Sequence, residues 1–563
     1  MSMRFLVPPP VTVPQALQQA VGGHPLVAEL LYRRGIRDPQ TARAFLDPDA
    51  WQPSPPDSLP DLARAAALLE DAIRSGRRIL VWGDFDVDGQ TSTALLVESL
   101  TRLGAQVHFY IPNRARESHG VHIASLQRLA NDPGFDLLLT CDTGITACQA
   151  VDFAHQQGAQ VIITDHHELG ERLPAAEAVV NPRRLPPEHP LATLPGVGVA
   201  WQLASALLSA HNEEADSLLD LVALGIVADV AEQRGDTRYL LQRGLHVLRG
   251  TNRLGLRALA KAANLNLARL SDEGIGFSLG PRLNALGRLD DANAAVELLT
   301  TQDPARADYL ALRLESLNAR RRMLTEQVYQ AAKAQLERNP ELARLPVIVL
   351  GQEGWPGGVV GIVASRLVEE FGRPVMLFSV GADGVARGSA RSVEGVHITQ
   401  AIAAQAHYLL KFGGHPMAAG CSLKAENLPA FREGLARTLK GRIPPEGVQP
   451  TLHVDAELPL GALSPELVAD LERLAPFGAG NPQPVFLARG LQLDTVQSLG
   501  REGEHRKVVV RDSSGEQHAV LWWRSRQADL PPQRFDLAYT ARMNDFRGEQ
   551  RLQITWVAMQ VAE

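Results

Sequence analysis

The sequence has little cysteine and no long apolar run. Its 563 residues include three cysteines, Cys141, Cys148 and Cys421. These are too few for a disulfide framework, and Cys141 and Cys148 lack the partners of a zinc site. No apolar run reaches the roughly 18 residues of a membrane helix, and the first residues, MSMRFLVPPPVTVP, lack the charged-then-apolar layout of a signal peptide. We therefore expect a cytoplasmic chain without a membrane segment, in which the cysteines are small core residues.

The chain also lacks a basic excess. The formal net charge is −7, and 45% of the residues are hydrophobic and 21% charged, which is typical of ordinary globular proteins. A nucleic-acid site would therefore have to be a local positive surface or depend on bound metal ions. The length is too great for one core and predicts about three or four domains.

What is present is an acidic stretch directly behind a short apolar run. In VWGDFDVDGQTST, residues 81–93, Asp84, Asp86 and Asp88 alternate with apolar residues. Alternate side chains of an extended segment share one face, so the three carboxylates would lie together. Like charges this close repel each other, and a shared cation is the simplest way to hold them.

Two other interpretations of this stretch exist. An EF-hand calcium loop matches Asp84, Asp86, Asp88 and Gly89, but Leu95 occupies the position of its bidentate glutamate and the preceding segment has the pattern of a strand. A solvated acidic turn between a strand and a helix also fits. The stretch alone does not exclude that second alternative.

Strands and helices alternate from residue 61 onward. The pattern predicts helices at 61–75, 92–103, 125–131 and 146–157, and strands at 79–82, 107–111, 137–140 and 161–164. Short apolar runs between amphipathic helices indicate an α/β fold with a parallel sheet that is covered on both faces.

Acids and imidazoles follow three of these strands. They are Asp84, Asp86 and Asp88 after the first, Asp142 after strand 137–140, and Asp165, His166 and His167 after strand 161–164; Asp229 interrupts a later apolar run. Ligand sites in such sheets lie beyond the carboxyl ends of the strands, so these side chains should face one crevice. Oxygen and imidazole ligands favour Mn²⁺ or Mg²⁺ and leave catalytic zinc open, and four or five carboxylates favour two ions over one.

The rest of the chain divides by composition. We expect an N-terminal arm at 1–60, a first α/β domain at 61–240, a helical spacer at 241–344 with a long helix at 308–339, a second α/β domain at 345–445, and a β-barrel or sandwich at 446–563. In the second α/β domain, glycines surround Arg387, Ser389, Arg391 and His415. Exposed amides beside arginines suit phosphate, and tight turns explain each stretch equally well. The pair Trp522-Trp523 gives weak support for base stacking.

Several motifs resemble a known family. GDFDVDG, CDTGI, TDHHE and VADVAE, in this order, resemble the four motifs of the DHH phosphoesterase superfamily. GWPGGVVGIVASRL, RGSARSVEGVHI and FGGHPMAAG resemble its associated C-terminal (DHHA1-like) domain, and LGPRLNALGRL and LAPFGAGNPQPVF are similar to segments of RecJ-type exonucleases. The resemblance covers nearly the whole chain past residue 60 and implies that the last domain is an oligonucleotide-binding (OB) fold.

The resemblance also implies roles for individual residues. The residues that match metal ligands are Asp86, Asp88, Asp142, His166 and Asp229, with Asp142 bridging two Mn²⁺ or Mg²⁺ ions. Asp84 and His167 match residues that complete or support this site. By the same resemblance, Arg114, Ser389 and Arg391 would bind the 5′ phosphate or adjacent backbone, and Arg282 and His415 would face the scissile bond.

The activity implied by the resemblance is 5′-to-3′ degradation of single-stranded DNA to 5′ mononucleotides, in repair and recombination. The enzyme would be a monomer that prefers 5′-phosphorylated ends and works with a single-strand-binding protein and a helicase. Two departures from the family pattern occur, because Pro356 stands where histidine is frequent and Ser118-His119 where Gly-Tyr is frequent. The rival functions are a small-substrate phosphoesterase, which would not need the spacer and β-domain, and a metal-free scaffold, which would have broken motifs.

Overall fold

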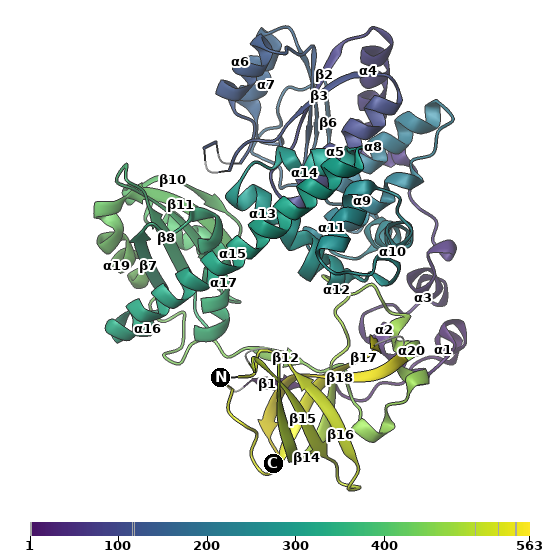
Figure 1. The fold of residues 1–563 in the computed structure, drawn as a ribbon, viewed down its shortest axis with the longest axis vertical. Helices are drawn as coiled ribbons and strands as arrows, with labels where there is room; N and C mark the ends of the chain where they lie inside the picture. Colours follow the sequence, from purple (N-terminus) through teal and green to yellow (C-terminus); the bar gives the residue numbers. More distant parts are fainter. Residues whose placement is uncertain are drawn as a thin grey trace.

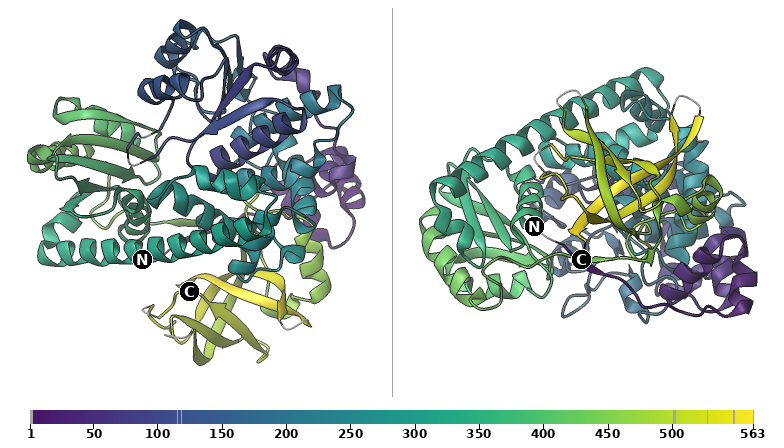
Figure 2. Two further views of the ribbon diagram at one scale, coloured as in Figure 1. Left: turned by 45° about the horizontal axis from the view of Figure 1, so that its top comes forward. Right: turned by 90° about the horizontal axis from the view of Figure 1, so that it is seen from below.

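Four regions make up the fold. The computed structural model describes residues 3–114, 116–117, 119–500, 503–526, 528–546 and 549–562. A first α/β unit lies at the top of Figure 1, a second α/β unit at the left, a β-barrel at the bottom, and a group of helices between them. The turned views in Figure 2 show the same arrangement around the long helix α15.

The first unit is built on a five-stranded parallel sheet, as the sequence predicts. Its strand order is β3-β2-β4-β5-β6. The strands are β2 (Arg78–Trp82), β3 (Gln106–Tyr110), β4 (Leu137–Cys141), β5 (Gln160–Thr164) and β6 (Ala178–Val180). The helices are α4 (Leu62–Arg74), α5 (Val87–Arg102), α6 (Ile123–Asn131), α7 (Cys148–Gln156) and α8 (Gly196–Ala210).

Alternate side chains of these strands enter two separate cores. Ile79 and Val81 pack in the core that contains residues of α4, α5 and α8. Leu80 and Trp82 pack in the core that contains residues of α6 and α7. Helices therefore cover both faces, which is why the strands are apolar throughout. The parallel pairing of β2 with β4 and of β4 with β5 brings their carboxyl ends to one edge.

The central helices share a core with the first unit. They are α9 (Leu219–Ala228), α10 (Gly235–Arg249), α11 (Leu254–Ala262), α12 (Asp272–Gly274), the π-helix η6 (Ile275–Leu279), α13 (Gly280–Leu289), α14 (Asn293–Thr300) and α15 (Pro304–Arg338). One hydrophobic core runs from Leu59 to Leu314, so the boundary predicted at residue 240 falls inside it. Within the described ranges, no helix is both long and apolar enough to cross a membrane.

The second unit has a mixed five-stranded sheet with the order β10-β11-β9-β8-β7. Its strands are β7 (Ile348–Glu353), β8 (Val375–Val380), β9 (Val385–Arg391), β10 (Leu409–Gly414) and β11 (Ala418–Lys424). Its helices are α16 (Pro340–Arg344), α17 (Gly357–Phe371), α18 (Ile398–Ala403) and α19 (Leu428–Leu439). Residues of α15 and α17 pack on one face of the sheet, and residues of α18 and α19 pack on the other.

The last region is a closed barrel. Its strands are β13 (Ala456–Glu457), β14 (Phe486–Leu499), β15 (His505–Arg511), β16 (Gln517–Trp522), β17 (Phe535–Phe546) and β18 (Glu549–Val561), with α20 (Pro465–Glu472) between β13 and β14. Pairing of β14 with both β15 and β17 closes the sheet. Trp522 stacks on Trp556 with ring centroids 4.3 Å apart and so faces the interior, whereas Trp523 is 45% exposed.

The N-terminal residues pack on this barrel. Strand β1 (Arg4–Leu6) pairs in parallel with β12 (Thr451–His453). Residues of α1 (Gln15–Val21), α2 (Pro25–Arg33) and α3 (Pro39–Leu46) lie in the same core as Phe486 and Tyr539. Residues 1–60, which the sequence analysis interprets as an arm leading into the first domain, thus also pack on the barrel. No local pattern reveals this packing, because the partners stand at opposite ends of the chain.

Arg238 of α10 joins the central helices to this terminal assembly. Its guanidinium donates hydrogen bonds to the carbonyl oxygens of Phe45, Leu474, Ala475 and Pro476, each at 3.0 Å. It also lies over the ring of Phe45, 3.6 Å from the centroid. Burial lowers the pKa of Arg238 to about 9. One buried side chain thus connects α3, α10 and the segment between α20 and β14.

Candidate active site

The candidate metal ligands gather at the carboxyl edge of the first sheet. Asp84 and Asp86 follow β2, Asp142 follows β4, and His166 and His167 follow β5. Asp229, at the C-terminal end of α9, reaches the same edge, because its carboxylate Oδ2 lies 4.0 Å from Nδ1 of His166. The side chains that follow the three strand ends therefore lie close together, as the sequence predicts.

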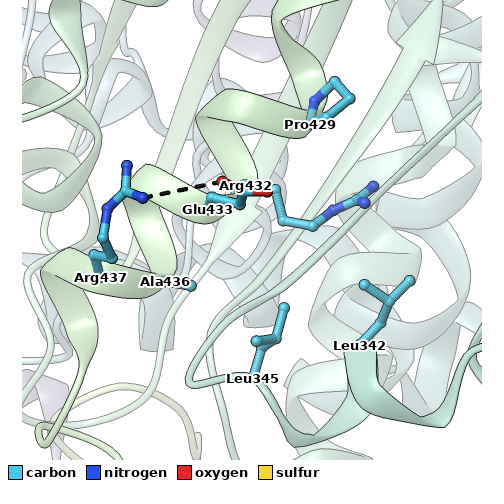
Figure 3. Close-up of a pocket in the computed structure, with 7 residues that line it drawn as sticks. All are labelled: Leu342, Leu345, Pro429, Arg432, Glu433, Ala436 and Arg437. Atoms are coloured by element: carbon cyan, nitrogen blue, oxygen red, sulfur yellow. Dashed lines mark ion pairs between the residues drawn. The ribbon is translucent and has the colours of Figure 1, made fainter.

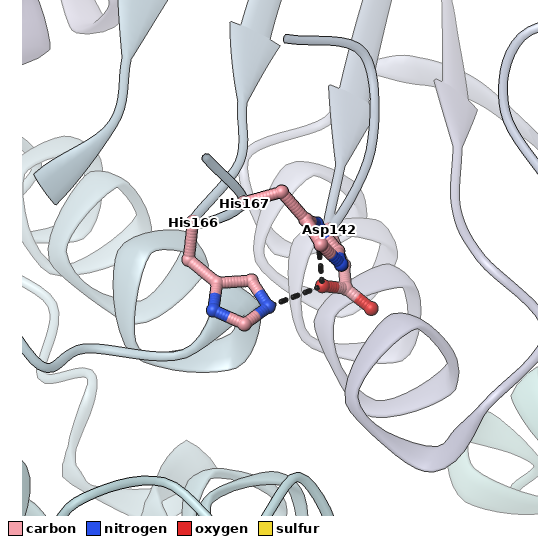
Figure 4. Close-up of side chains that lie close together, drawn as sticks. All are labelled: Asp142, His166 and His167. Atoms are coloured by element: carbon pink, nitrogen blue, oxygen red, sulfur yellow. Dashed lines mark ion pairs between the residues drawn. The ribbon is translucent and has the colours of Figure 1, made fainter. Parts of the chain in front are cut away.

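These side chains form three overlapping groups. Ligand atoms lie within 4.8 Å of one another in the groups Asp84–Asp86–Asp142, Asp88–His166–Asp229 and Asp142–His166–His167. Oδ1 of Asp142 lies 3.1 Å from Nε2 of His166 and 4.0 Å from Nδ1 of His167 (Figure 4). Asp142 is thus the residue that connects the Asp84–Asp86 side of the site with its histidine side.

Asp88 does not share a face with Asp84 and Asp86, contrary to the interpretation of an extended stretch. Helix α5 begins at Val87, five residues earlier than predicted, because Asp86 caps it by accepting a hydrogen bond from Gly89 N at 3.1 Å. Asp88 lies in the first helical turn and accepts hydrogen bonds from Gly196 N at 2.6 Å and Val197 N at 2.8 Å. The helix therefore directs Asp88 into a different group from its two neighbours.

Burial and mutual repulsion disfavour charge on these carboxylates when no cation is bound. Burial, together with neighbouring aspartates, raises the pKa of Asp88 and of Asp142 well above the usual range. The same causes raise the pKa of Asp84, and they raise that of Asp229 to about 7. Oδ1 of Asp84 is buried and accepts no hydrogen bond within the described part of the chain. A buried carboxylate oxygen without a donor is suited to a cation.

Asp165 contacts both histidines and favours the protonated form of His167. Its Oδ1 lies 2.7 Å from Nδ1 of His167 and also accepts the backbone N–H groups of His166 and His167. Burial opposes the charge on His167, but this hydrogen bond and the negative charges of Asp165, Asp84 and Asp86 together outweigh burial and raise the pKa to about 9. Burial and the neighbouring His167 lower the pKa of His166 to about 4. His166 is therefore neutral near pH 7 and has a lone pair available for a metal ion.

The donor set fits divalent cations. It consists of carboxylate oxygens and imidazole nitrogens, the ligands that suit Mn²⁺, with the carboxylates also suiting Mg²⁺. Burying several carboxylates side by side is unfavourable unless a positive charge lies between them. The residues present at this edge therefore match the metal site expected from the sequence.

The pKa shifts predict how the metal-free protein responds to pH. Folded His167 keeps its proton up to about pH 9, whereas an unfolded histidine loses it near 6.5. Its stabilisation should therefore be lost as pH rises through this window, and Asp229, with a pKa of about 7, acts in the same direction. Denaturant titrations in chelator should show a lower free energy of unfolding at pH 9 than at pH 6.5, with a smaller difference in His167→Asn. Mn²⁺ binds the deprotonated ligands, so with Mn²⁺ present the free energy of unfolding should fall less as pH rises. An equal fall with Mn²⁺ would contradict the assignment of these residues to a metal site.

A cluster of arginines lies beside the acidic groups. Arg114 lies over the ring of Phe85, 4.9 Å from its centroid, and interacts electrostatically with Asp84 and Asp86. Burial and the positive charge of Arg114 lower the pKa of Arg391. Burial, followed by Arg114, Arg321 and Arg391, lowers the pKa of Arg288 to about 10. Arg391 also donates to Ser389 Oγ at 3.0 Å. Such a concentration of positive charge suits an anion of high charge.

Two glycines explain how Arg288 reaches this position. A Cβ on Gly287 would lie 2.1 Å from the carbonyl oxygen of Phe85, and a Cβ on Gly358 would lie 2.2 Å from that of Arg288. Only glycine allows the end of α13 to contact both the acidic loop and the start of α17. These contacts account for LGPRLNALGRL and GWPGG, and they place Arg288 between the two α/β units.

Arg288 was missed by sequence analysis, which selected Arg282 from the same helix. Nε of Arg282 lies 2.5 Å from Oε2 of Glu315, and its Nη1 donates to the carbonyl of Ser278 at 2.9 Å. His415 is exposed and joins none of the carboxylate–histidine groups in the described residues. A contact with the scissile bond remains a prediction for both.

The sequence departs from the family pattern at Ser118-His119 and at Pro356, and the structure describes His119 and Pro356. Ser118 lies outside the described residues, whereas His119 packs on Phe85 and places Nδ1 3.4 Å from Oδ2 of Asp84. Pro356 directly precedes α17 as its N-cap residue. Neither residue disturbs the three ligand groups.

A separate pocket of about 390 Å³ lies in the second unit between α16 and α19. Figure 3 shows its lining, which consists of Leu342, Leu345, Pro429, Arg432, Glu433, Ala436 and Arg437. Arg437 pairs with Glu433 at 3.9 Å, and Arg432 donates to the carbonyl of Val349 at 2.9 Å. The pocket shares no residue with the metal groups or the arginine cluster.

Family models match three parts of the chain. They describe the N-terminal domain of the DHH family at residues 78–226, the DHHA1 domain at 344–441 and the RecJ OB domain at 454–558. The α/β architecture with a second α/β domain and a C-terminal OB barrel, expected from the sequence, is therefore confirmed.

Individual relatives match nearly the whole chain. The single-stranded-DNA-specific exonuclease RecJ of Escherichia coli is 35% identical over 94% of this chain and 95% of its own length. That of Bacillus subtilis is 36% identical over 94% of this chain and 67% of its own. The crystal structure of RecJ from Thermus thermophilus in complex with Mn²⁺ covers all of this chain and 80% of its own, with 32% identity and a TM-score of 0.85. A Mg²⁺ complex of that protein matches with a TM-score of 0.79. The chain belongs to the RecJ family of single-stranded-DNA-specific exonucleases in the DHH superfamily.

Proposed function

We propose that this chain is a metal-dependent exonuclease that degrades single-stranded DNA from the 5′ end to 5′ mononucleotides, in DNA repair and recombination. One observation carries the proposal: a set of buried carboxylates and histidines lies directly beside a cluster of partly buried arginines. The first can hold cations, and the second can bind a phosphate. Together they suit a phosphodiester whose terminal phosphate is held while the neighbouring bond is cut.

The residues divide into two cation positions. Asp84, Asp86 and Asp142 would hold one ion, and Asp88, His166 and Asp229 the other, with Asp142 between them. Two Mn²⁺ or Mg²⁺ ions would supply an activated water and stabilise the leaving 3′ oxygen. The Mn²⁺ and Mg²⁺ complexes of the Thermus thermophilus relative support this choice of ions.

Arg114, Arg288 and Arg391 would bind the 5′ phosphate. A terminal phosphate carries more charge than an internal diester and can be contacted from more sides, so a convergent arginine cluster favours it. Because Arg114 also interacts with Asp84 and Asp86, the bound end would lie next to the cations. The distance between the arginines and the ligand groups would then determine that one nucleotide is removed at each cut.

The direct test uses single strands labelled at the 5′ or the 3′ end, with Mn²⁺, Mg²⁺ or chelator. We expect mononucleotides from the 5′ label at once, a ladder from the 3′ label, and no products in chelator. Release of mononucleotides from the 3′ label first, or equal activity on duplex, would contradict the proposal. Because the substrate is unpaired DNA, we also expect a helicase and a single-strand-binding protein to supply it. We further propose that the chain acts as a monomer in the cytoplasm.

The arginine cluster gives a prediction about end preference. Arg391→Ala and Arg288→Ala should each lower the ratio of kcat/KM for 5′-phosphorylated over 5′-hydroxyl strands by roughly tenfold or more, since a hydrogen bond to a charged group contributes about 1.5–3 kcal/mol. Arg387→Ala is the matched control, because Arg387 lies on the same strand but pairs with Asp383 at 2.8 Å. An unchanged ratio in both cluster variants would place the phosphate site elsewhere.

A further inference from the structure

A strained residue stands directly beside the candidate metal ligand Asp229. Val230 has a φ of 58°, a left-handed conformation that is unfavourable for a β-branched residue by about 1–2 kcal/mol. Its N–H donates to Val227 O at 3.2 Å, and that of Ala231 donates to Ile226 O at 3.1 Å. This is the Schellman ending of a helix, in which the left-handed position is usually glycine or asparagine.

Two other helices of the chain end in the same way with the usual residue. Asn212 after α8 and Asn264 after α11 have φ values of 58° and 54° and make the equivalent pair of hydrogen bonds. The side chain of Val230 does not stabilise this helix ending by packing, because Val230 is 68% exposed. Strain of this kind clusters at functional sites, so the exposed side chain itself is the feature to explain.

A second exposed apolar residue lies on the neighbouring turn. Phe277 is 77% exposed and belongs to the π-helix η6, a distortion that is frequent at functional sites. This turn packs on the end of α9, because a Cβ on Gly276 would lie 3.6 Å from Val227 and one on Gly280 would lie 3.8 Å from Ala228. Val230 and Phe277 thus flank the same helix end, which carries Asp229.

Both residues lie on the side of the site that contacts the barrel segment. Three residues after Val230, Gln233 N donates to the carbonyl of Ala479 at 2.8 Å. Just before η6, the carboxylate of Asp272 accepts a hydrogen bond from the backbone of Phe477, and Glu273 pairs with Arg542 of β17. A strand that runs from the metal ligands to the barrel would pass this junction.

We infer that Val230 and Phe277 form an apolar contact for one unpaired nucleobase, between the metal ligands and the barrel. The inference rests on the proposed function, since it needs a single strand in the site. Every nucleobase has a face that can stack on an aromatic ring, so the contact would hold the strand without sequence preference. In a duplex both faces of a base are covered by its stacked neighbours, which makes the contact selective for single strands.

The first test measures binding of 5′-phosphorylated single strands in chelator, with one abasic position moved along the strand. Phe277→Ala should weaken binding of the single strand at least about fivefold. Phe277→Trp, which keeps an aromatic ring, should bind as the parent does. One abasic position should weaken the parent to the same extent and leave Phe277→Ala unaffected. Leu312→Ala, which removes a side chain that is 65% exposed on α15, is the control. Binding by Phe277→Ala within twofold of the parent, or abasic effects identical in both proteins, would overturn the inference.

The second test distinguishes the contribution of the Val230 side chain to binding from the effect of its strained backbone on stability. Val230→Gly should raise the midpoint of thermal unfolding by about 2 °C, because it removes the strain, and should still weaken binding of single strands. Asn264→Gly should leave binding unchanged. Unchanged binding by Val230→Gly would show that the residue is only a helix cap. A parent that does not degrade single strands at all would refute the proposed function instead, so the two failures are distinguishable.

Discussion

Asp142→Asn should lower the rate of single-strand hydrolysis by about a thousandfold or more while leaving binding of single strands nearly unchanged. Asp142 belongs to both the Asp84–Asp86 group and the histidine group, with Oδ1 3.1 Å from Nε2 of His166. An amide could not replace a carboxylate that two cations would share. Losing several kcal/mol of charge stabilisation in the transition state corresponds to this factor. The measurement is single-turnover cleavage at saturating Mn²⁺, together with binding in chelator.

The same substitution should have an opposite effect on stability. Burial and neighbouring aspartates raise the pKa of Asp142, which means that its charge is unfavourable without a cation. Asp142→Asn should therefore be more stable than the parent in chelator and gain less stability from Mn²⁺. Asp152→Asn, an exposed carboxylate on α7, is the control for both measurements. Hydrolysis within tenfold of the parent would refute the bridging role.

Arg238→Met should lower the free energy of unfolding by about 3–5 kcal/mol. The substitution keeps an apolar chain of similar length but removes four hydrogen bonds from the guanidinium. The carbonyl of Ala475 loses its donor, whereas those of Phe45, Leu474 and Pro476 keep a second one from Gln242 or Asn481. A hydrogen bond from a charged donor contributes about 1.5–3 kcal/mol, and part of the loss is offset by the remaining donors, water or rearrangement. Urea titration of the parent and variant measures the difference.

Arg243→Met is the matched control for this second prediction. Arg243 lies on the same helix, is 40% exposed at its side chain and pairs with Asp49 at 3.1 Å. Exposed ion pairs contribute little, typically below about 1 kcal/mol. Equal effects of the two substitutions would show that Arg238 is not the connection between the regions that its hydrogen bonds indicate.

The sequence predicts the strand ends of the site well because their chemistry is local. In a parallel sheet, any residue just after a strand reaches the same edge, so Asp142 and His166 could be placed without coordinates. Asp88 could not be placed in this way. Its direction depends on whether α5 begins before or after it, and Asp86 is compatible with both an extended strand exit and a helix cap.

The arginine cluster and the packing of the chain ends could not be predicted from local sequence patterns. Arg282 and Arg288 lie on one short helix, and only the close approach of Gly287 to Phe85 decides that Arg288 joins Arg114 and Arg391. The packing of α1 to α3 on the barrel has no sequence signal at all. Their apolar residues form an ordinary amphipathic pattern that fits any apolar partner.

The shared core of the two chain ends has a consequence for synthesis on the ribosome. Leu17 and Leu30 leave the ribosome early, but Phe486 and Tyr539 of the same core are added about 450–520 residues later. At about 5–20 residues per second, the first helices would wait roughly 25–100 seconds for their core. During that time the first α/β unit can fold behind them, while their apolar faces remain open to chaperones or to another nascent chain.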